Sequence, residues 1–174
     1  MTKQGIAIGI GGISRSGKSF LAKELSLRIK QSDRKVKVLD QDDFVFPEDK
    51  IPMIRDHIDW EIPESIDFRK LGESVSQSVL ENDVVIAEGL MIFWDTGIFN
   101  LLDYKIFIKL ERDEFISRKQ TDLRWGKEPD WYIDHIWNGY IKYGQYPKGL
   151  RPDLVLSGNE MFDLNGIFDR IFMP

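Results

Sequence analysis

The sequence predicts an α/β fold in which helices flank a five-stranded parallel sheet. Two observations lead to this prediction. Short apolar runs that are typical of buried strands alternate along the chain with longer segments whose apolar residues recur at helical spacing. The first apolar run also leads through a glycine-rich loop directly into the first helical segment. No repeat, low-complexity run or linker interrupts the pattern, so we expect a single domain over residues 1–174.

Each expected element follows from this alternation. The apolar runs predict strands at residues 6–10, 35–39, 84–87, 104–110 and 154–156. Helical spacing predicts helices at 18–30, 65–80, 113–123 and 131–143, and a weaker last helix at 160–168, which contains Gly166. Proline and charge fill residues 46–63, which we expect to form a loop with little regular structure, and 126–130 is expected to be a second exposed loop.

The glycine-rich loop carries the clearest functional signal. Residues 12–19 match the pattern G-x-x-x-x-G-K-[ST], in which backbone N–H groups surround phosphate oxygens and the next helix adds the positive end of its dipole. Lys18 is expected to reach the β- and γ-phosphates, and the Ser19 hydroxyl to bind Mg²⁺. A turn that binds nothing is the alternative. The predicted ATP-binding residues here are Gly12, Ile13, Ser14, Arg15, Ser16, Gly17, Lys18 and Ser19.

Acidic residues follow the second and third expected strands. Asp40, Asp42 and Asp43 come at the end of the second, and Glu88 follows the third. Ligands bind beyond the carboxyl ends of the strands in open parallel sheets, so these carboxylates are expected to meet the phosphate loop. One of them could accept a proton from a substrate hydroxyl, and another could bind Mg²⁺. The alternatives are a solvated acidic turn and a glutamate that only caps a helix or turn.

Composition excludes several classes of protein. The net charge of −5 argues against a general nucleic-acid binder. The chain has no cysteine, which excludes a disulfide framework and is consistent with a reducing compartment, and we expect a cytoplasmic protein. Neither a signal peptide nor a membrane-spanning segment is expected. His57 and His135 lack a suitably spaced second ligand, so no metal site at histidine is expected.

Several motifs together resemble a known family. They are the loop at 12–19, Gln-Asp-Asp-Phe at 41–44, Trp-Glu-Ile-Pro-Glu-Ser-Ile-Asp-Phe at 60–68, Glu-Gly-Leu-Met-Ile-Phe at 88–93, and Trp-Tyr-Ile-Asp-His-Ile-Trp at 131–137. In this order they resemble the nicotinamide riboside kinases, within the wider uridine kinase and phosphoribulokinase group. The resemblance covers nearly the whole chain. The phosphate loop alone is generic, whereas the motifs at 41–44 and 60–67 are more discriminating.

The resemblance implies a P-loop kinase fold with a small lid at about 113–130. It implies transfer of the γ-phosphoryl group of ATP to the 5′-hydroxyl of a ribosyl nucleoside, with nicotinamide riboside ahead of uridine or cytidine. By position, the catalytic residues would be Asp42, Lys18 and Arg118, and the Mg²⁺ ligands would be Ser19, Asp42 and Glu88. The nucleoside would contact Asp42, Trp60, Glu61 and Trp125. ATP would contact Arg124, with Arg118 and Lys119 beside it in the lid.

Departures from the family pattern bear on the exact substrate and on the turnover rate. Glu61 stands where the family usually has an aspartate that binds the ribose hydroxyls, and the lid has fewer arginines than the family usually has. Two alternatives therefore stay open: a kinase of the same group for another small hydroxylated compound, and a nucleotide-binding regulatory module without transfer activity. The expected partners are a nucleoside and ATP, without nucleic acid or membrane, in a monomer or homodimer. The sequence leaves open a preference for ATP or GTP.

Overall fold

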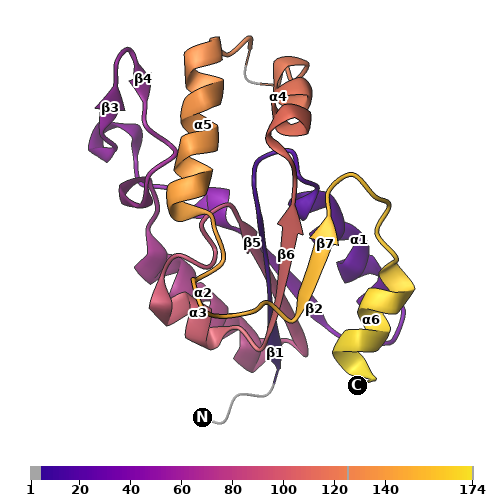
Figure 1. Ribbon diagram of the computed structural model, residues 1–174. Coiled ribbons are helices and arrows are strands. Elements are labelled where there is room, and N and C mark those ends of the chain that lie inside the picture. The colour runs from indigo at the N-terminus through magenta and orange to yellow at the C-terminus, as the bar shows by residue number, and fades with distance from the viewer. Residues whose placement is uncertain (1–4, 125, 174) are drawn as a thin grey trace.

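A computed structural model of the chain describes residues 5–124 and 126–173 (Figure 1). Its central sheet has five parallel strands in the order β2-β5-β1-β6-β7. This arrangement confirms the predicted α/β fold with a five-stranded parallel sheet. The strands are β1 (Ile6–Gly12), β2 (Val36–Asp40), β5 (Val84–Gly89), β6 (Tyr104–Lys109) and β7 (Leu154–Ser157).

Helices cover both faces of this sheet, so its central strands are apolar on both sides. Ile8 and Ile10 of β1 belong to a buried cluster with side chains of α1 and α6. The side chain of Ala7, one residue before Ile8, points to the other face of the sheet. It belongs to a second buried cluster, which includes side chains of α2, α3 and α5. The helices are α1 (Lys18–Lys30), α2 (Phe68–Glu81), α3 (Thr96–Leu101), α4 (Arg112–Gln120), α5 (Asp130–Tyr143) and α6 (Leu164–Phe172).

Local capping explains where helix boundaries differ from the predicted ones. The helix expected at 65–80 starts at Phe68, because the Asp67 side chain accepts a hydrogen bond from the Lys70 N–H at 2.9 Å. The last helix starts at Leu164 instead of residue 160, because Asp163 caps it in the same way. The helix expected to reach residue 123 ends at Gln120, and the hydroxyl of Thr121 donates to carbonyls of its last turn.

Two further elements were not predicted. The short helix α3 starts behind Asp95, whose side chain accepts a hydrogen bond from the Ile98 N–H. The expected irregular loop at 46–63 contains a small antiparallel hairpin, formed by β3 (Met53–Ile54) and β4 (His57–Ile58). This hairpin, α4 and α5 all lie beyond the carboxyl ends of the strands (Figure 1). Within the described part of the chain, no helix is both long enough and apolar enough to cross a membrane.

Candidate active site

A cleft of about 1020 Å³ lies beyond the carboxyl ends of β1, β2 and β5. It is lined by the phosphate loop, by the residues that follow β2 and β5, by the β3–β4 hairpin, and by the segment from α4 to α5. The lining brings together seven of the fifteen residues that the sequence predicted for the site. They are Ser14, Lys18, Ser19, Asp42, Trp60, Glu61 and Glu88, joined by Asp40, His57, Lys119, Lys127, Glu128 and Tyr132.

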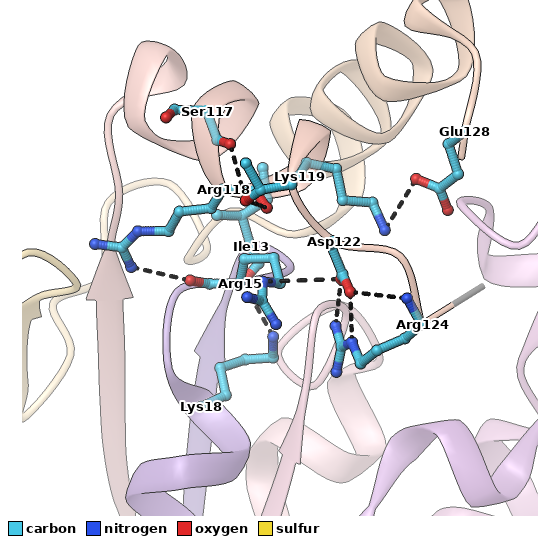
Figure 2. Close-up of polar contacts among 10 residues, drawn as sticks. Ile13, Arg15, Lys18, Ser117, Arg118, Lys119, Asp122, Arg124 and Glu128 are labelled. Atoms are coloured by element: carbon cyan, nitrogen blue, oxygen red, sulfur yellow. Dashed lines mark hydrogen bonds and ion pairs between the residues drawn. The ribbon is translucent and has the colours of Figure 1, made fainter. Parts of the chain in front are cut away.

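The phosphate loop joins β1 to α1, and glycine is required at its two ends. Gly12 and Gly17 have positive φ angles of 154° and 100°, and a Cβ atom on Gly12 would lie 2.6 Å from the carbonyl oxygen of Ile108. Helix α1 begins at Lys18, so its free N–H groups face the loop. The Lys18 ammonium donates to the Ile13 carbonyl at 3.1 Å (Figure 2). The loop therefore holds the ammonium at the place where a polyphosphate would bind.

Carboxylates surround Lys18 from two neighbouring strands. Asp42 lies on a 3₁₀ turn, Gln41–Phe44, that follows β2, and the side chain of Asp40 accepts the Asp42 N–H at 2.9 Å. Burial raises the pKa of Asp42, and the nearby charge of Asp40 raises it further, against the opposing effect of Lys18. Burial likewise raises the pKa of Glu88, whereas Lys18 and a hydrogen bond from Ser19 oppose the rise. Asp42 and Glu88 are therefore stronger proton acceptors than free carboxylates.

These oxygen ligands suit a magnesium ion that is shared with a nucleotide. Ser19, Asp42 and Glu88 present hard oxygen atoms. The negative charges of Asp40, Asp42 and Glu88 repel one another, and a bound cation would reduce this repulsion. In residues 5–124 and 126–173, no three Asp, Glu or His side chains form a group that could hold a metal by itself. Mg²⁺ is usually held by one or two carboxylates together with substrate phosphates, so the residues present fit such an ion.

Two of the predicted nucleoside residues also belong to this cleft. Trp60 and Glu61 both line it. Glu61 is half-buried, and the backbone of α5 packs directly against it at Gly139, where a Cβ atom would lie 2.9 Å from the Glu61 Cβ. Burial raises the pKa of Glu61 from 4.5 to about 7, and Asp42 and Asp59 add to this effect while Lys119 opposes it. Near neutral pH, Glu61 can therefore both donate and accept hydrogen bonds.

Two arginines were predicted for a lid at about 113–130, and both contact protein groups. Arg118 lies near the end of α4, and Arg124 lies in the segment that follows this helix. The Arg118 guanidinium donates to the carbonyl of Arg15 at 3.1 Å (Figure 2). It also donates to the carbonyl of Gly158 at 3.0 Å and to the side chains of Asn159 and Glu114. These bonds hold the end of α4 against the phosphate loop. Arg118 thus lies beside the predicted ATP site, with its donors bound to protein acceptors.

Arg124 is likewise held by a carboxylate. It forms two hydrogen bonds with Asp122, at 2.8 Å and 2.6 Å, and Arg15 of the phosphate loop lies 3.8 Å from the same side chain (Figure 2). The lid cations that line the cleft are instead Lys119 and Lys127. Trp125, the other predicted lid residue, lies outside the described residues.

Sequence reasoning missed several residues that line the cleft, among them His57, Lys127, Glu128 and Tyr132. His57 was missed because its segment was expected to lack regular structure. Lys127 and Glu128 lie in a short loop without a recognisable motif, although their place in the lid was a signal that could have identified them. Glu128 forms an ion pair with Lys119 at 3.0 Å, so it holds one of the two lid cations in the cleft.

Comparisons with known proteins agree with this geometry, although no family model matches. The chain is 27% identical over 165 residues to nicotinamide riboside kinase 1 from Rattus norvegicus, covering 85% of this chain and 83% of that protein. It is 26% identical over 162 residues to uridine kinase from Lactobacillus helveticus, covering 78% and 75%. A possible uridine kinase from Bacillus stearothermophilus superposes with a TM-score of 0.60 at 18% identity, covering 90% of each chain.

The chain has a P-loop kinase fold and is similar to proteins named as kinases. The fold extends to more distant kinases, since shikimate kinase from Aquifex aeolicus matches with a TM-score of 0.52 at 21% identity over 97% of this chain and 94% of that one. These relatives confirm the resemblance to nicotinamide riboside kinases and uridine kinases that the motifs indicated.

Proposed function

We propose that the kinase transfers the γ-phosphoryl group of ATP to the 5′-hydroxyl of a ribosyl nucleoside, and that nicotinamide riboside is the preferred acceptor. The observation that carries this proposal is that one cleft joins the phosphate loop, Asp42 and the pair Trp60 and Glu61. A phosphate donor bound at the phosphate loop and a nucleoside bound at Trp60 and Glu61 would therefore share one cleft with Asp42. The named relatives, which are nicotinamide riboside and uridine kinases, support the same substrate class.

Asp42 is the proton acceptor in this proposal. Its position in the cleft with Lys18 and the phosphate loop supports this role. The raised pKa of Asp42 belongs to the metal-free site, because a bound Mg²⁺ would lower it. Phosphoryl transfer needs little more from it than orientation of the hydroxyl and late removal of the proton. Lys18 neutralises charge on the transferring group. Bound through Ser19, Asp42 and Glu88, Mg²⁺ would supply further positive charge at the phosphates.

Glu61 and Trp60 bind the nucleoside in this proposal. A ribose presents two neighbouring hydroxyl groups, and one carboxyl group can hydrogen-bond with both. A site that pairs its buried polar groups with a substrate hydroxyl rejects analogues that lack the hydroxyl, so 2′-deoxy nucleosides should be poor substrates. The Trp60 ring, which lines the cleft beside Glu61, would stack on the base.

The charge of the cleft favours a cationic base. The described lining carries seven carboxylates, from Asp40, Asp42, Glu48, Asp56, Glu61, Glu88 and Glu128, but only three lysines, Lys18, Lys119 and Lys127. Such an excess of negative charge attracts cations, and the nicotinamide ring of the riboside is one. A cation over the Trp60 ring would add about 0.5–2 kcal/mol of binding energy. Uridine, which is neutral, would gain neither contribution.

A substrate panel tests the proposal. Purified protein would be incubated with ATP and Mg²⁺ and each of nicotinamide riboside, uridine, cytidine and the matching 2′-deoxy compounds, and ADP release would be followed. The expected order places nicotinamide riboside first and every deoxy compound far behind its ribose counterpart. Equal turnover of both sugars would contradict the role of Glu61. Preferred turnover of uridine would favour the second candidate, a uridine kinase, which is supported by the relatives named uridine kinase.

A matched substitution separates the base from the sugar. Trp60→Ala should reduce activity with nicotinamide riboside more than activity with uridine, because only the former loses the attraction between a cation and the ring. Equal losses would contradict the preference for a cationic base. Binding of ATP without ADP release for any acceptor would favour the remaining alternative, a regulatory module without transfer activity.

A further inference from the structure

The nucleoside end of the cleft is built on a segment without helix or long strand. Residues 58–61, here called the substrate loop, run from β4 to Glu61. Side chains supply many of the loop's hydrogen-bonding partners. The Asp59 carboxylate accepts the Glu61 N–H at 3.2 Å, and the buried Ser65 hydroxyl donates to the Trp60 carbonyl at 3.0 Å. The position of Glu61 therefore depends on the side chains that hold this loop.

One face of α5 forms the support for the substrate loop. Tyr132 donates from its hydroxyl to the Ile58 carbonyl at 3.3 Å, His135 contacts Asp59, and Gly139 packs against Glu61. Positions 132, 135 and 139 lie on the same side of a helix, because three or four residues complete each turn. Figure 1 shows α5 standing beside the hairpin that leads into this loop. The three contacts follow the loop in order from Ile58 to Glu61.

The central contact is the shorter of the two hydrogen bonds between α5 and the substrate loop. The His135 Nε2 atom lies 2.7 Å from the Asp59 Oδ1 atom, with the two side chains 21% and 11% exposed. A carboxylate oxygen only accepts, so Nε2 carries the proton and donates. The same Oδ1 atom accepts the Glu61 N–H. A single oxygen thus links the imidazole of α5 to the backbone of Glu61.

We infer that His135 is a positioning residue for nucleoside recognition, acting through Asp59 on the backbone of Glu61. This inference rests on the proposed role of Glu61 in binding the ribose. With His135 in place, Asp59 is fixed in the orientation in which it accepts the Glu61 N–H. Without it, Asp59 would be free to turn toward water, and the Glu61 carboxyl would lose its fixed place in the cleft. The phosphate loop takes no part in these hydrogen bonds, so it would be unaffected.

Steady-state kinetics test this role in the whole protein. His135→Ala should raise the KM for the nucleoside by roughly 10- to 100-fold, the effect of losing one hydrogen bond to a charged group, and should leave the KM for ATP unchanged. His135→Gln should bring the KM for the nucleoside most of the way back to the wild-type value, because the glutamine amide can donate from nearly the same place. Asp134→Asn is the matched control on the exposed side of α5, where Asp134 pairs with Arg112. A rise of both KM values together would overturn the inference.

A double substitution tests the path through Glu61. If His135 acts by positioning Glu61, His135→Ala should raise the nucleoside KM by less than about 2-fold in a Glu61→Ala protein, since coupled residues are not additive. A fully additive effect would show that His135 acts elsewhere and would overturn the inference. If Glu61→Ala itself left nucleoside kinetics unchanged, the proposed function of Glu61 would fail instead, which is a different result.

Hydrogen exchange gives a readout that needs no substrate. In the ligand-free protein, the Glu61 amide should exchange at least about 10-fold faster in His135→Ala than in the wild type, because its acceptor is no longer held in place. The amides of β1 should be unchanged, which would show that the fold is intact. Unchanged exchange at Glu61 would overturn the inference, even if no ribosyl nucleoside proved to be a substrate.

Discussion

Replacing Glu61 with glutamine should stabilise the folded protein at alkaline pH. Burial, together with Asp42 and Asp59, raises the pKa of Glu61 from 4.5 to about 7. In the unfolded chain the same carboxyl group has its ordinary pKa. Between these two values the folded protein binds more protons than the unfolded chain, so its free energy of unfolding falls as pH rises. A glutamine at this place is neutral at every pH and avoids the loss.

The size of the effect follows from the two pKa values. Their difference corresponds to about 3 kcal/mol at a pH above both. Because Glu61 is half-buried and faces a cleft that water can enter, we expect about 2–3 kcal/mol in practice. The stability is fully present below the unfolded pKa and is lost as pH rises to the folded pKa, which is the reverse of the usual behaviour of an ion-paired carboxylate.

Urea unfolding at about pH 4.5 and about pH 8.5 would measure this effect. The quantity of interest is the difference in free energy of unfolding between Glu61→Gln and the wild type, because all other titrating groups cancel in it. Glu73→Gln serves as the control, since Glu73 pairs with Arg69 on the exposed surface of α2. The difference should grow by about 2–3 kcal/mol toward alkaline pH. A difference that stayed constant, or that grew toward acid pH, would refute the reasoning.

The remaining predictions concern catalysis and the lid. Lys18→Ala should abolish phosphoryl transfer without a marked change in the melting temperature of the ligand-free protein, and near-normal turnover would contradict the assignment of the phosphate loop. Asp42→Asn should lower kcat by about 10²-fold or more, as measured by ADP release, whereas a larger loss in Asp43→Asn would place the proton acceptor one residue later. The lid segment at 118–124 and Gly126 should gain hydrogen-exchange protection when ATP and nucleoside bind together, and equal protection in both states would argue against closure.

The phosphate loop and its surroundings were predictable because their signals are local or follow from topology. A strand, a glycine loop and a helix in direct succession define the loop at 12–19. The meeting of Asp42 and Glu88 beside Lys18 followed from the rule that parallel strands end at the same edge of a sheet, since β2 and β5 are neighbours. Trp60 and Glu61 lack such a local signal, and only the family resemblance identified them.

Other parts of the site depend on contacts between residues distant in the sequence. His135 and Asp59 are 76 residues apart, and no local pattern reports that α5 packs against the substrate loop. The hydrogen bonds of Arg118 to Gly158 and Asn159 span about 40 residues and likewise had no sequence signal. Helix α3 is too short for a periodic pattern, so its only local sign was the capping side chain of Asp95.

Identification of the reaction product tests the central claim most directly. The protein would be incubated with ATP, Mg²⁺ and nicotinamide riboside, and the product would be analysed by phosphorus–proton correlation in nuclear magnetic resonance. If the cleft joins the two substrates as we propose, phosphorus will couple to the 5′ protons of the ribose, in amounts equal to the ADP released, and Lys18→Ala will form none. Phosphorus at any other position, or ADP released without a phosphorylated nucleoside, would contradict the account.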